Sequence, residues 1–124
     1  MEFKISITRA KVTMCKLTGK YNRIVLTDAF LESQKRMQSL NKYRLILDAK
    51  EVTQTFDADH IENETERIRI ANKMISAFAQ FENVKIATVL NFEDVNHFIQ
   101  FLVKRKGIEL ELFDNLKEAV RWIG

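Results

Sequence analysis

Hydrophobic and polar side chains alternate in two short runs at the start of the chain. Residues 3–8 and 12–17 place apolar side chains at alternate positions, which is the period of a half-buried β-strand. Because only residues 9–11 separate the two runs, we expect them to form a hairpin. Gly19 follows the second run, and residues 19–22 are interpreted as a turn. The chain is therefore predicted to begin with two antiparallel strands.

Strand-type and helix-type patterns alternate after this hairpin. Short, largely apolar runs predict three more strands, at residues 43–48, 84–90 and 108–113. Apolar residues spaced along one helical face predict four helices, near residues 27–40, 57–81, 91–106 and 114–124. Thr27 or Asp28 is expected to cap the first helix and Asp114 or Asn115 the last, while Gly107 follows the end of the third.

The order of these elements predicts an α/β fold, β-β-α-β-α-β-α-β-α. Repeated βα units need right-handed crossovers and give parallel strands, whereas the hairpin adds an antiparallel pair. We therefore expect a mixed, mostly parallel five-stranded sheet with four helices. A length of 124 residues fits one domain that spans residues 1–124. The buried helix faces are expected to include Ile68 in the second helix and Leu116 and Val120 in the last.

The second and third predicted helices are apolar over wide arcs. Ile70, Met74 and Phe81 lie on one arc, and Phe98 and Phe101 lie on the other. The simplest interpretation is that the two helices are neighbours and cover each other's apolar side chains. The alternative is that part of the arcs stays exposed and forms a homodimer interface or the mouth of an apolar ligand pocket.

Composition excludes several classes of protein. Hydrophobic residues make up 46% and charged residues 30%, as in soluble globular domains. The net charge of +3 is too small and too scattered to predict nucleic-acid binding. No apolar run is long enough for stable membrane insertion, and the start of the chain lacks a signal-peptide pattern. The single cysteine, Cys15, cannot form an internal disulfide, which favours a cytoplasmic location.

The turns carry none of the motifs that usually bring chemistry to such a fold. There is no Gly-rich phosphate loop, no nucleophile elbow and no cluster of histidine and carboxylate ligands. His60 and His97 fall on different predicted helices, and Cys15 lies inside a strand pattern next to Met14. We therefore expect no catalytic residue, no metal and no cofactor, and hence a protein that is not an enzyme.

Two stretches carry a resemblance to a known family. Leu45-Ile46-Leu47-Asp48 is an apolar strand that ends in an aspartate, and residues 110–120 form a strand, an aspartate and a helix with Glu-Ala near its middle. At this length and element order, the chain resembles the STAS domain, the fold of bacterial anti-sigma-factor antagonists and of the cytoplasmic tails of sulfate transporters. It resembles a bacterial branch of small stand-alone domains related to STAS, without a settled role.

The resemblance implies a non-enzymatic regulatory module that binds a protein partner, whose identity is unknown. Regulatory members carry a phosphorylatable serine before the second helix, whereas this chain has Asp57 and Ala58 at the matching positions, so we expect no serine phospho-switch. The residues expected to dock the partner are Thr53, Thr55, Asp57, Asp59 and Glu62.

Two alternatives to this hypothesis stay open. The acidic run from Asp57 to Glu66 is also what a simple helix start would carry, because acidic side chains offset the helix dipole. The second functional hypothesis is a small carrier of an apolar ligand or lipid, bound between the second and third helices. Its ligand or dimer surface would use Ile70, Met74, Phe81, Phe98 and Phe101.

Overall fold

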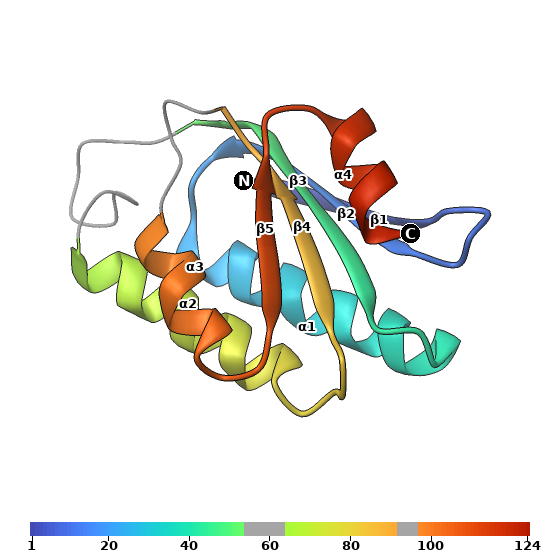
Figure 1. Cartoon of the computed structure of the whole chain (residues 1–124). Helices are drawn as coiled ribbons and strands as arrows, with labels where there is room; N and C mark the ends of the chain where they lie inside the picture. The colour runs from blue at the N-terminus through green and yellow to red at the C-terminus, as the bar shows by residue number, and fades with distance from the viewer. Residues whose placement is uncertain (54–63, 92–96) are drawn as a thin grey trace.

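Nine elements follow one another in the predicted order. The computed structural model describes residues 1–53, 64–91 and 97–124 (Figure 1). Within these residues the elements are β1 (Glu2–Ile7), β2 (Thr13–Lys20), α1 (Arg23–Leu40), β3 (Arg44–Thr53), α2 (Glu64–Phe78), β4 (Lys85–Val89), α3 (His97–Lys104), β5 (Glu109–Phe113) and α4 (Leu116–Ile123). The α/β class and the element order predicted from the sequence are confirmed.

The five strands form one mixed sheet in the order β1-β2-β3-β4-β5. Strands β1 and β2 pair as an antiparallel hairpin, and the three other pairs are parallel. The register brings Leu47 of β3 beside Thr88 of β4, and Thr88 beside Leu112 of β5. These three neighbours form one row across the sheet, in the middle of β3 and near the carboxyl ends of β4 and β5.

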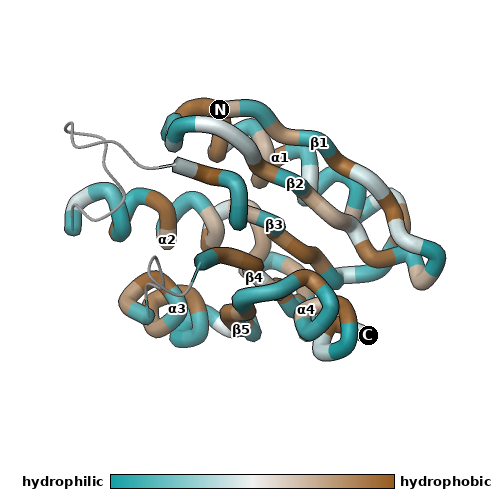
Figure 2. The backbone as a smooth tube through the Cα atoms, turned by 90° about the horizontal axis from the view of Figure 1, so that it is seen from above, coloured by the Kyte–Doolittle hydropathy of each residue, from teal (hydrophilic) through white to brown (hydrophobic). Residues whose placement is uncertain are grey.

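Helices α1, α2 and α3 cover one face of the sheet and α4 covers the other (Figures 1 and 2). Successive strand residues point to opposite faces, so Leu45 and Leu47 enter the larger core, whereas Ile46 packs with Ala119 and Ile123 of α4. Each such burial stabilises the fold by roughly 1.5–3 kcal/mol. Among the described helices, none is both long and apolar enough to cross a membrane.

The first helix starts earlier than predicted, and the strand before it is longer. Asn22, not Thr27 or Asp28, is the N-cap of α1, and its Oδ1 accepts a hydrogen bond from the Val25 amide at 3.0 Å. The predicted turn at residues 19–22 was wrong, because β2 continues to Lys20, which pairs with Thr53. The same pairing extends β3 to Thr53, through residues that the sequence interpretation assigned to a connection. Parallel pairing here overrides the local polar pattern.

Some of the other predicted helix ends and buried helix faces are confirmed, and others are wrong. Asn115 caps α4, with its Oδ1 bonded to the Glu118 amide at 2.9 Å. Gly107 follows α3 in the left-handed conformation, as predicted. The described part of α2 ends at Phe78 rather than near residue 81, since the chain turns at residues 79–83. The predicted burial of Ile68, Leu116 and Val120 was wrong, because these side chains lie at the solvent-facing margins of their helices: they are 40%, 37% and 45% exposed.

Candidate functional site

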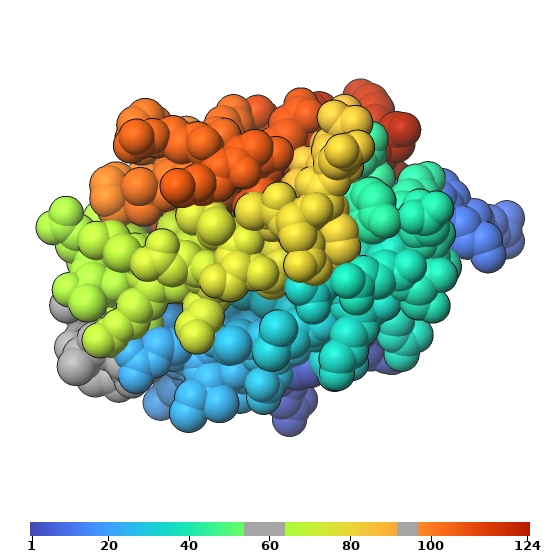
Figure 3. Space-filling model, turned by 90° about the horizontal axis from the view of Figure 1, so that it is seen from below, coloured from blue at the N-terminus to red at the C-terminus, as the bar shows by residue number. Residues whose placement is uncertain are grey.

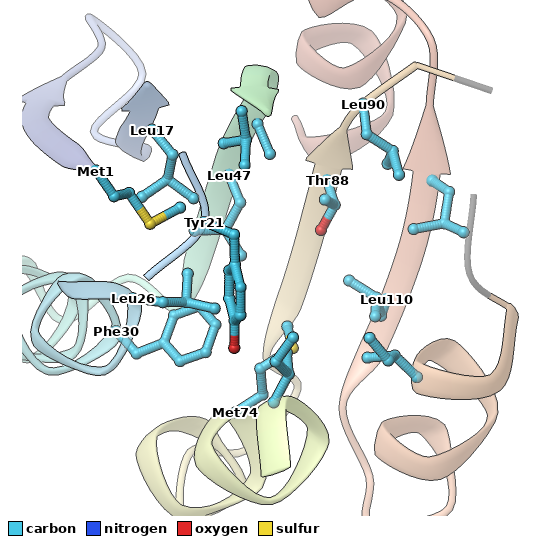
Figure 4. A pocket seen from close by; sticks show the side chains of 15 residues that line it. Met1, Leu17, Tyr21, Leu26, Phe30, Leu47, Met74, Thr88, Leu90 and Leu110 are labelled. Carbon is cyan, nitrogen blue, oxygen red and sulfur yellow. The ribbon is translucent and has the colours of Figure 1, made fainter. Parts of the chain in front are cut away.

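An apolar pocket of about 140 Å³ lies between the sheet and the three helices that share one of its faces (Figure 4). Met1 and Tyr21 flank it. The sheet side contributes Leu17, Leu47, Ala49, Val52, Thr88, Leu90, Leu110 and Leu112, and the helices contribute Leu26, Phe30, Ile70, Met74 and Ile99. Among these described side chains, only those of Tyr21 and Thr88 carry a hydroxyl group. The lining is thus suited to apolar groups.

The position of the pocket follows from the sheet register. Its floor contains the row formed by Leu47, Thr88 and Leu112, and it continues through Ala49 and Leu90 toward the carboxyl ends of the strands. Ala49 and Thr88 are short side chains, so they leave space where the neighbouring leucines fill it. In open α/β sheets, ligands bind outside the carboxyl ends of the strands. The pocket therefore lies against the helix-covered face of the sheet and extends toward the carboxyl edge, which is the side where open α/β sheets bind ligands.

The buried carboxylate of Glu66 lies next to Tyr21, which forms one wall of the pocket. Glu66, in the first turn of α2, has no exposed surface. Its Oε2 accepts a hydrogen bond from the Tyr21 hydroxyl at 2.6 Å, and its Oε1 accepts from Nη1 of Arg23 and Nη1 of Arg69, both at 2.8 Å. We call these four residues the Glu66 cluster. It joins the end of β2, the start of α1 and the start of α2.

Opposing effects act on the Glu66 carboxyl. Burial alone raises its pKa, because the charged form loses its hydration. The hydrogen bonds from Tyr21 and Arg69, and the charge and hydrogen bond of Arg23, outweigh that effect and hold the pKa of Glu66 below its ordinary value. Glu66 is therefore a carboxylate at neutral pH, and its negative charge is compensated inside the cluster.

The five residues expected to form an apolar surface do not stay together. Ile70 and Met74 line the pocket and are almost fully buried. Phe81 instead stacks on Tyr43, with ring centroids 4.5 Å apart. Phe98 and Phe101 lie on α3 and are 36% and 57% exposed. The pocket thus lies against the sheet rather than between α2 and α3, and α3 reaches it through Ile99.

The expected docking residues fall mostly outside the described part of the chain. This holds for Thr55, Asp57, Asp59 and Glu62. Thr53 is the last residue of β3, and its carbonyl accepts a hydrogen bond from the Tyr21 amide at 2.8 Å. The end of β3 is therefore bonded directly to the residue that forms one wall of the pocket.

Other groups with potential chemistry are separate from the pocket. Cys15 is fully buried, and burial raises the pKa of its thiol to about 11, an effect that the nearby Ser33 hydroxyl partly opposes. His97 is exposed, with Nδ1 3.1 Å from Oε1 of Gln100, and His60 lies outside the described residues. Across residues 1–53, 64–91 and 97–124, no three His, Cys, Asp or Glu side chains are grouped to hold a metal ion.

Sequence reasoning missed Tyr21 and the specific position of Glu66. Tyr21 was assigned to a turn, and Glu66 was one acid among several at a helix start. A hint was present, since a tyrosine directly before an asparagine N-cap is well placed to pack under the new helix. Arg69 is only three residues away on the same helix, but the other two partners of Glu66, Arg23 and Tyr21, are 43 and 45 residues away along the chain.

Comparison with known proteins supports the fold. No protein-family model and no curated protein matches the chain. A solved structure of an uncharacterized protein from the DUF3478 family, from Shewanella loihica PV-4, is similar, with a TM-score of 0.58 and 14% identity. The match covers 99% of this chain and 94% of that chain, and that protein is described as having a SpoIIAA-like fold. The chain is therefore an α/β domain with the SpoIIAA-like, or STAS-like, fold.

Proposed function

We propose that this domain is a non-enzymatic binding module that holds a small apolar molecule in the pocket beneath α1, α2 and α3. The observation that carries the proposal is the pocket itself, with about 140 Å³ of space and a lining that is apolar apart from two hydroxyls. An engineered cavity of about 150 Å³ with a similar lining stays dry and binds benzene. A molecule of that size suits the space.

Burial of apolar surface favours an occupant. The pocket is partly open to solvent, so its apolar lining is in contact with water rather than closed around a void. A ligand that fills the pocket removes that lining and its own apolar surface from water, and each Å² of apolar surface that is buried contributes roughly 25 cal/mol. An apolar molecule is therefore the occupant that this lining favours.

The side chains around the pocket support binding rather than catalysis. Catalysis by a nucleophile needs a base within hydrogen-bond reach of the attacking group. The Tyr21 hydroxyl is instead bonded to Glu66, whose charge is already compensated by two arginines. Cys15 does not line the pocket, and burial keeps its thiol protonated at neutral pH. We accordingly propose that the domain is a carrier or sensor and that it catalyses no reaction in the apolar pocket.

A regulatory role can be combined with ligand binding. The Thr53 carbonyl bonds to the Tyr21 amide, and Tyr21 in turn bonds to Glu66 at the start of α2. The segment between Thr53 and Glu64 contains the residues expected to dock a protein partner. Two described residues that lie on either side of that segment, Thr53 and Glu66, are therefore both bonded to Tyr21. This supports, as a second candidate, a protein-interaction module whose docking segment responds to the ligand.

The test combines an apolar probe with a variant that fills the pocket. Cyclohexane is added to the purified protein, and thermal unfolding is followed by circular dichroism. At ten times its dissociation constant, a ligand stabilises the folded state by about 1.4 kcal/mol, which raises the melting temperature of a domain this size by roughly 5 °C.

The matched variants are Ala49→Phe, which fills the pocket, and Ala10→Phe, at an exposed position in the β1–β2 turn. We expect cyclohexane to stabilise the wild type and Ala10→Phe but not Ala49→Phe. Native mass spectrometry of freshly purified protein then identifies any small molecule that co-purifies. The proposal fails if cyclohexane leaves the wild-type melting temperature unchanged, or if Ala49→Phe responds as the wild type does.

A further inference from the structure

Thr88 is the one polar residue in the row of three that crosses the pocket floor. It lies in β4, and its neighbours across the sheet are Leu47 of β3 and Leu112 of β5. All three residues line the pocket, and the Thr88 side chain points from β4 into it (Figure 4). Parallel strands that helices cover carry mostly apolar side chains. Valine has the shape of threonine and would fill this position without a hydroxyl, so the hydroxyl is the unusual feature.

The two hydroxyls of the pocket lining differ in their hydrogen bonds. The Tyr21 hydroxyl donates to Oε2 of Glu66 at 2.6 Å. Within the described part of the chain, no protein group is hydrogen-bonded to the Thr88 hydroxyl. Thr88 is therefore the residue of the lining whose hydroxyl is available to a ligand.

The helices make that hydroxyl costly to leave without a partner. Helices α1, α2 and α3 lie side by side as neighbouring bands over this face of the sheet (Figure 3), and Thr88 lies beneath them. A hydrocarbon that filled the pocket would bury the Thr88 hydroxyl without a hydrogen bond, which is unfavourable. We therefore expect the ligand to carry a polar atom that bonds to Thr88.

The rest of the lining favours a neutral group for that role. Among the described residues that line the pocket, none has a charged side chain. A charged group that entered this space would lose its hydration without gaining a counter-ion. The polar atom of the ligand is thus expected to belong to an uncharged group.

The number of donors favours a carbonyl oxygen over a hydroxyl group. A threonine hydroxyl can donate one hydrogen bond, and a carbonyl oxygen only accepts, so the two groups satisfy each other. Two hydroxyl groups share one hydrogen bond and leave one O–H that needs a further acceptor. Beyond Tyr21, the described lining side chains provide no oxygen that could accept it.

We propose that the ligand of this domain is a small, mainly apolar ketone or aldehyde whose carbonyl oxygen accepts a hydrogen bond from the Thr88 hydroxyl. This inference rests on the proposed function, because the pocket holds the hydrocarbon part of the molecule. Apolar pockets commonly use a few polar groups to fix the orientation of a ligand. Thr88 is then the residue that determines specificity, and a six-membered ring suits a space of about 140 Å³.

The test compares two probes of nearly the same shape, cyclohexanone and methylenecyclohexane, which differ only in C=O against C=CH₂. NMR titration gives their dissociation constants for the wild type and for Thr88→Val, which replaces the hydroxyl by a methyl group. The two constants are compared as a ratio in each protein, so that the different hydration of the probes cancels between the proteins. We expect the ratio to favour cyclohexanone roughly tenfold more in the wild type than in Thr88→Val, because only the wild type donates to the ketone.

Further variants separate the hydroxyl from the shape of the side chain. Thr18→Val makes the same substitution in β2, outside the pocket lining, and should leave the ratio unchanged. Thr88→Ser and Thr88→Ala both lack the methyl group and differ only in the hydroxyl, so the first should keep the preference for cyclohexanone and the second should lose it. The infrared carbonyl frequency of bound cyclohexanone, which a hydrogen bond lowers, should be higher in Thr88→Val than in the wild type.

The outcomes distinguish this inference from the proposed function. If the ratio is the same in the wild type, Thr88→Val and Thr88→Ala, or if the carbonyl frequency does not change, the assignment of the ketone to Thr88 is overturned while the apolar pocket stands. If neither of the two probes nor cyclohexane binds the folded wild type, the proposed function itself is overturned.

Discussion

Replacement of Glu66 tests how the site is held together. Glu66→Ala removes the hydrogen bond that the Tyr21 hydroxyl donates to a carboxylate, and hydrogen bonds to charged groups contribute about 1.5–3 kcal/mol. The ion pairs contribute less, because the Arg23 and Arg69 side chains are 38% and 51% exposed and can turn to water. Such pairs are worth roughly 0.2–1 kcal/mol each. Part of this loss is offset, since the variant no longer buries a charge.

The free energy of unfolding should therefore fall by about 2–4 kcal/mol in Glu66→Ala, combining these contributions. Glu66→Gln retains the shape of the side chain and an acceptor for Tyr21, so it should lose only about 1–2 kcal/mol. The matched control is Glu64→Gln, an exposed acid in the same helical turn, which should change stability by less than about 0.5 kcal/mol. Urea denaturation at pH 7, followed by circular dichroism, measures all four proteins.

Acid provides an independent check of the same cluster. The folded-state pKa of Glu66 lies below its ordinary value of 4.5, so the unfolded chain binds the proton more readily. The stabilisation that the Glu66 carboxylate gives to the folded state is fully present above the pKa of Glu66 in the unfolded chain. It is lost as the pH falls through the pKa of Glu66 in the folded protein. We expect the wild type to lose stability over that acid range more steeply than Glu66→Gln. Equal pH dependence in the two proteins, or a loss below about 0.5 kcal/mol in Glu66→Ala, would refute this reasoning.

Three further substitutions and one test of thiol reactivity have defined outcomes. Met74→Ala should lower the free energy of unfolding by about 2–5 kcal/mol in urea, because it deletes a buried side chain and enlarges the pocket. Asn22→Ala should cost about 1 kcal/mol in the same assay, since the α1 N-cap is lost. Gly107→Ala should cost about 1 kcal/mol through its φ of 87° alone, because nothing lies within 4 Å of the added carbon. The Cys15 thiol, with a pKa of about 11, should not react with a disulfide reagent at pH 8 until the protein is unfolded.

The fold was predictable because its signals are local and repeated. Alternation in β1 and β2, the short apolar runs of β3 to β5, and caps such as Asn115 each involve residues close together in the sequence. The predicted ends of β2 and β3 were wrong for one shared reason. Lys20 and Thr53 extend two strands by pairing with each other, and nothing in either local segment shows that pairing. Asn22, a good N-cap residue, was the signal that could have placed the helix start correctly.

The candidate site was much less predictable than the fold. Ile70 and Met74 were identified from helix periodicity. Periodicity shows which face of a helix is apolar, but it does not show which residues that face contacts. The pocket also needs short side chains at Ala49 and Thr88, on strands whose register is set by tertiary pairing. Glu66 illustrates the same limit, because its charge and the neighbouring Arg69 are visible in the sequence, but Tyr21 and Arg23 are brought to it only by the packing of α1 against α2.

The four methionines provide the most direct test of the central claim, which is that the pocket binds a small apolar molecule. Met1 and Met74 line the pocket, whereas Met14 lies against the core under α4 and Met37 is buried outside the pocket lining. The protein is labelled with ¹³C at the methionine methyl groups and titrated with cyclohexane in an NMR spectrometer. The account predicts that the Met1 and Met74 signals shift with saturation while those of Met14 and Met37 stay in place. Uniform shifts, or no shift at Met74 in the folded protein, would contradict it.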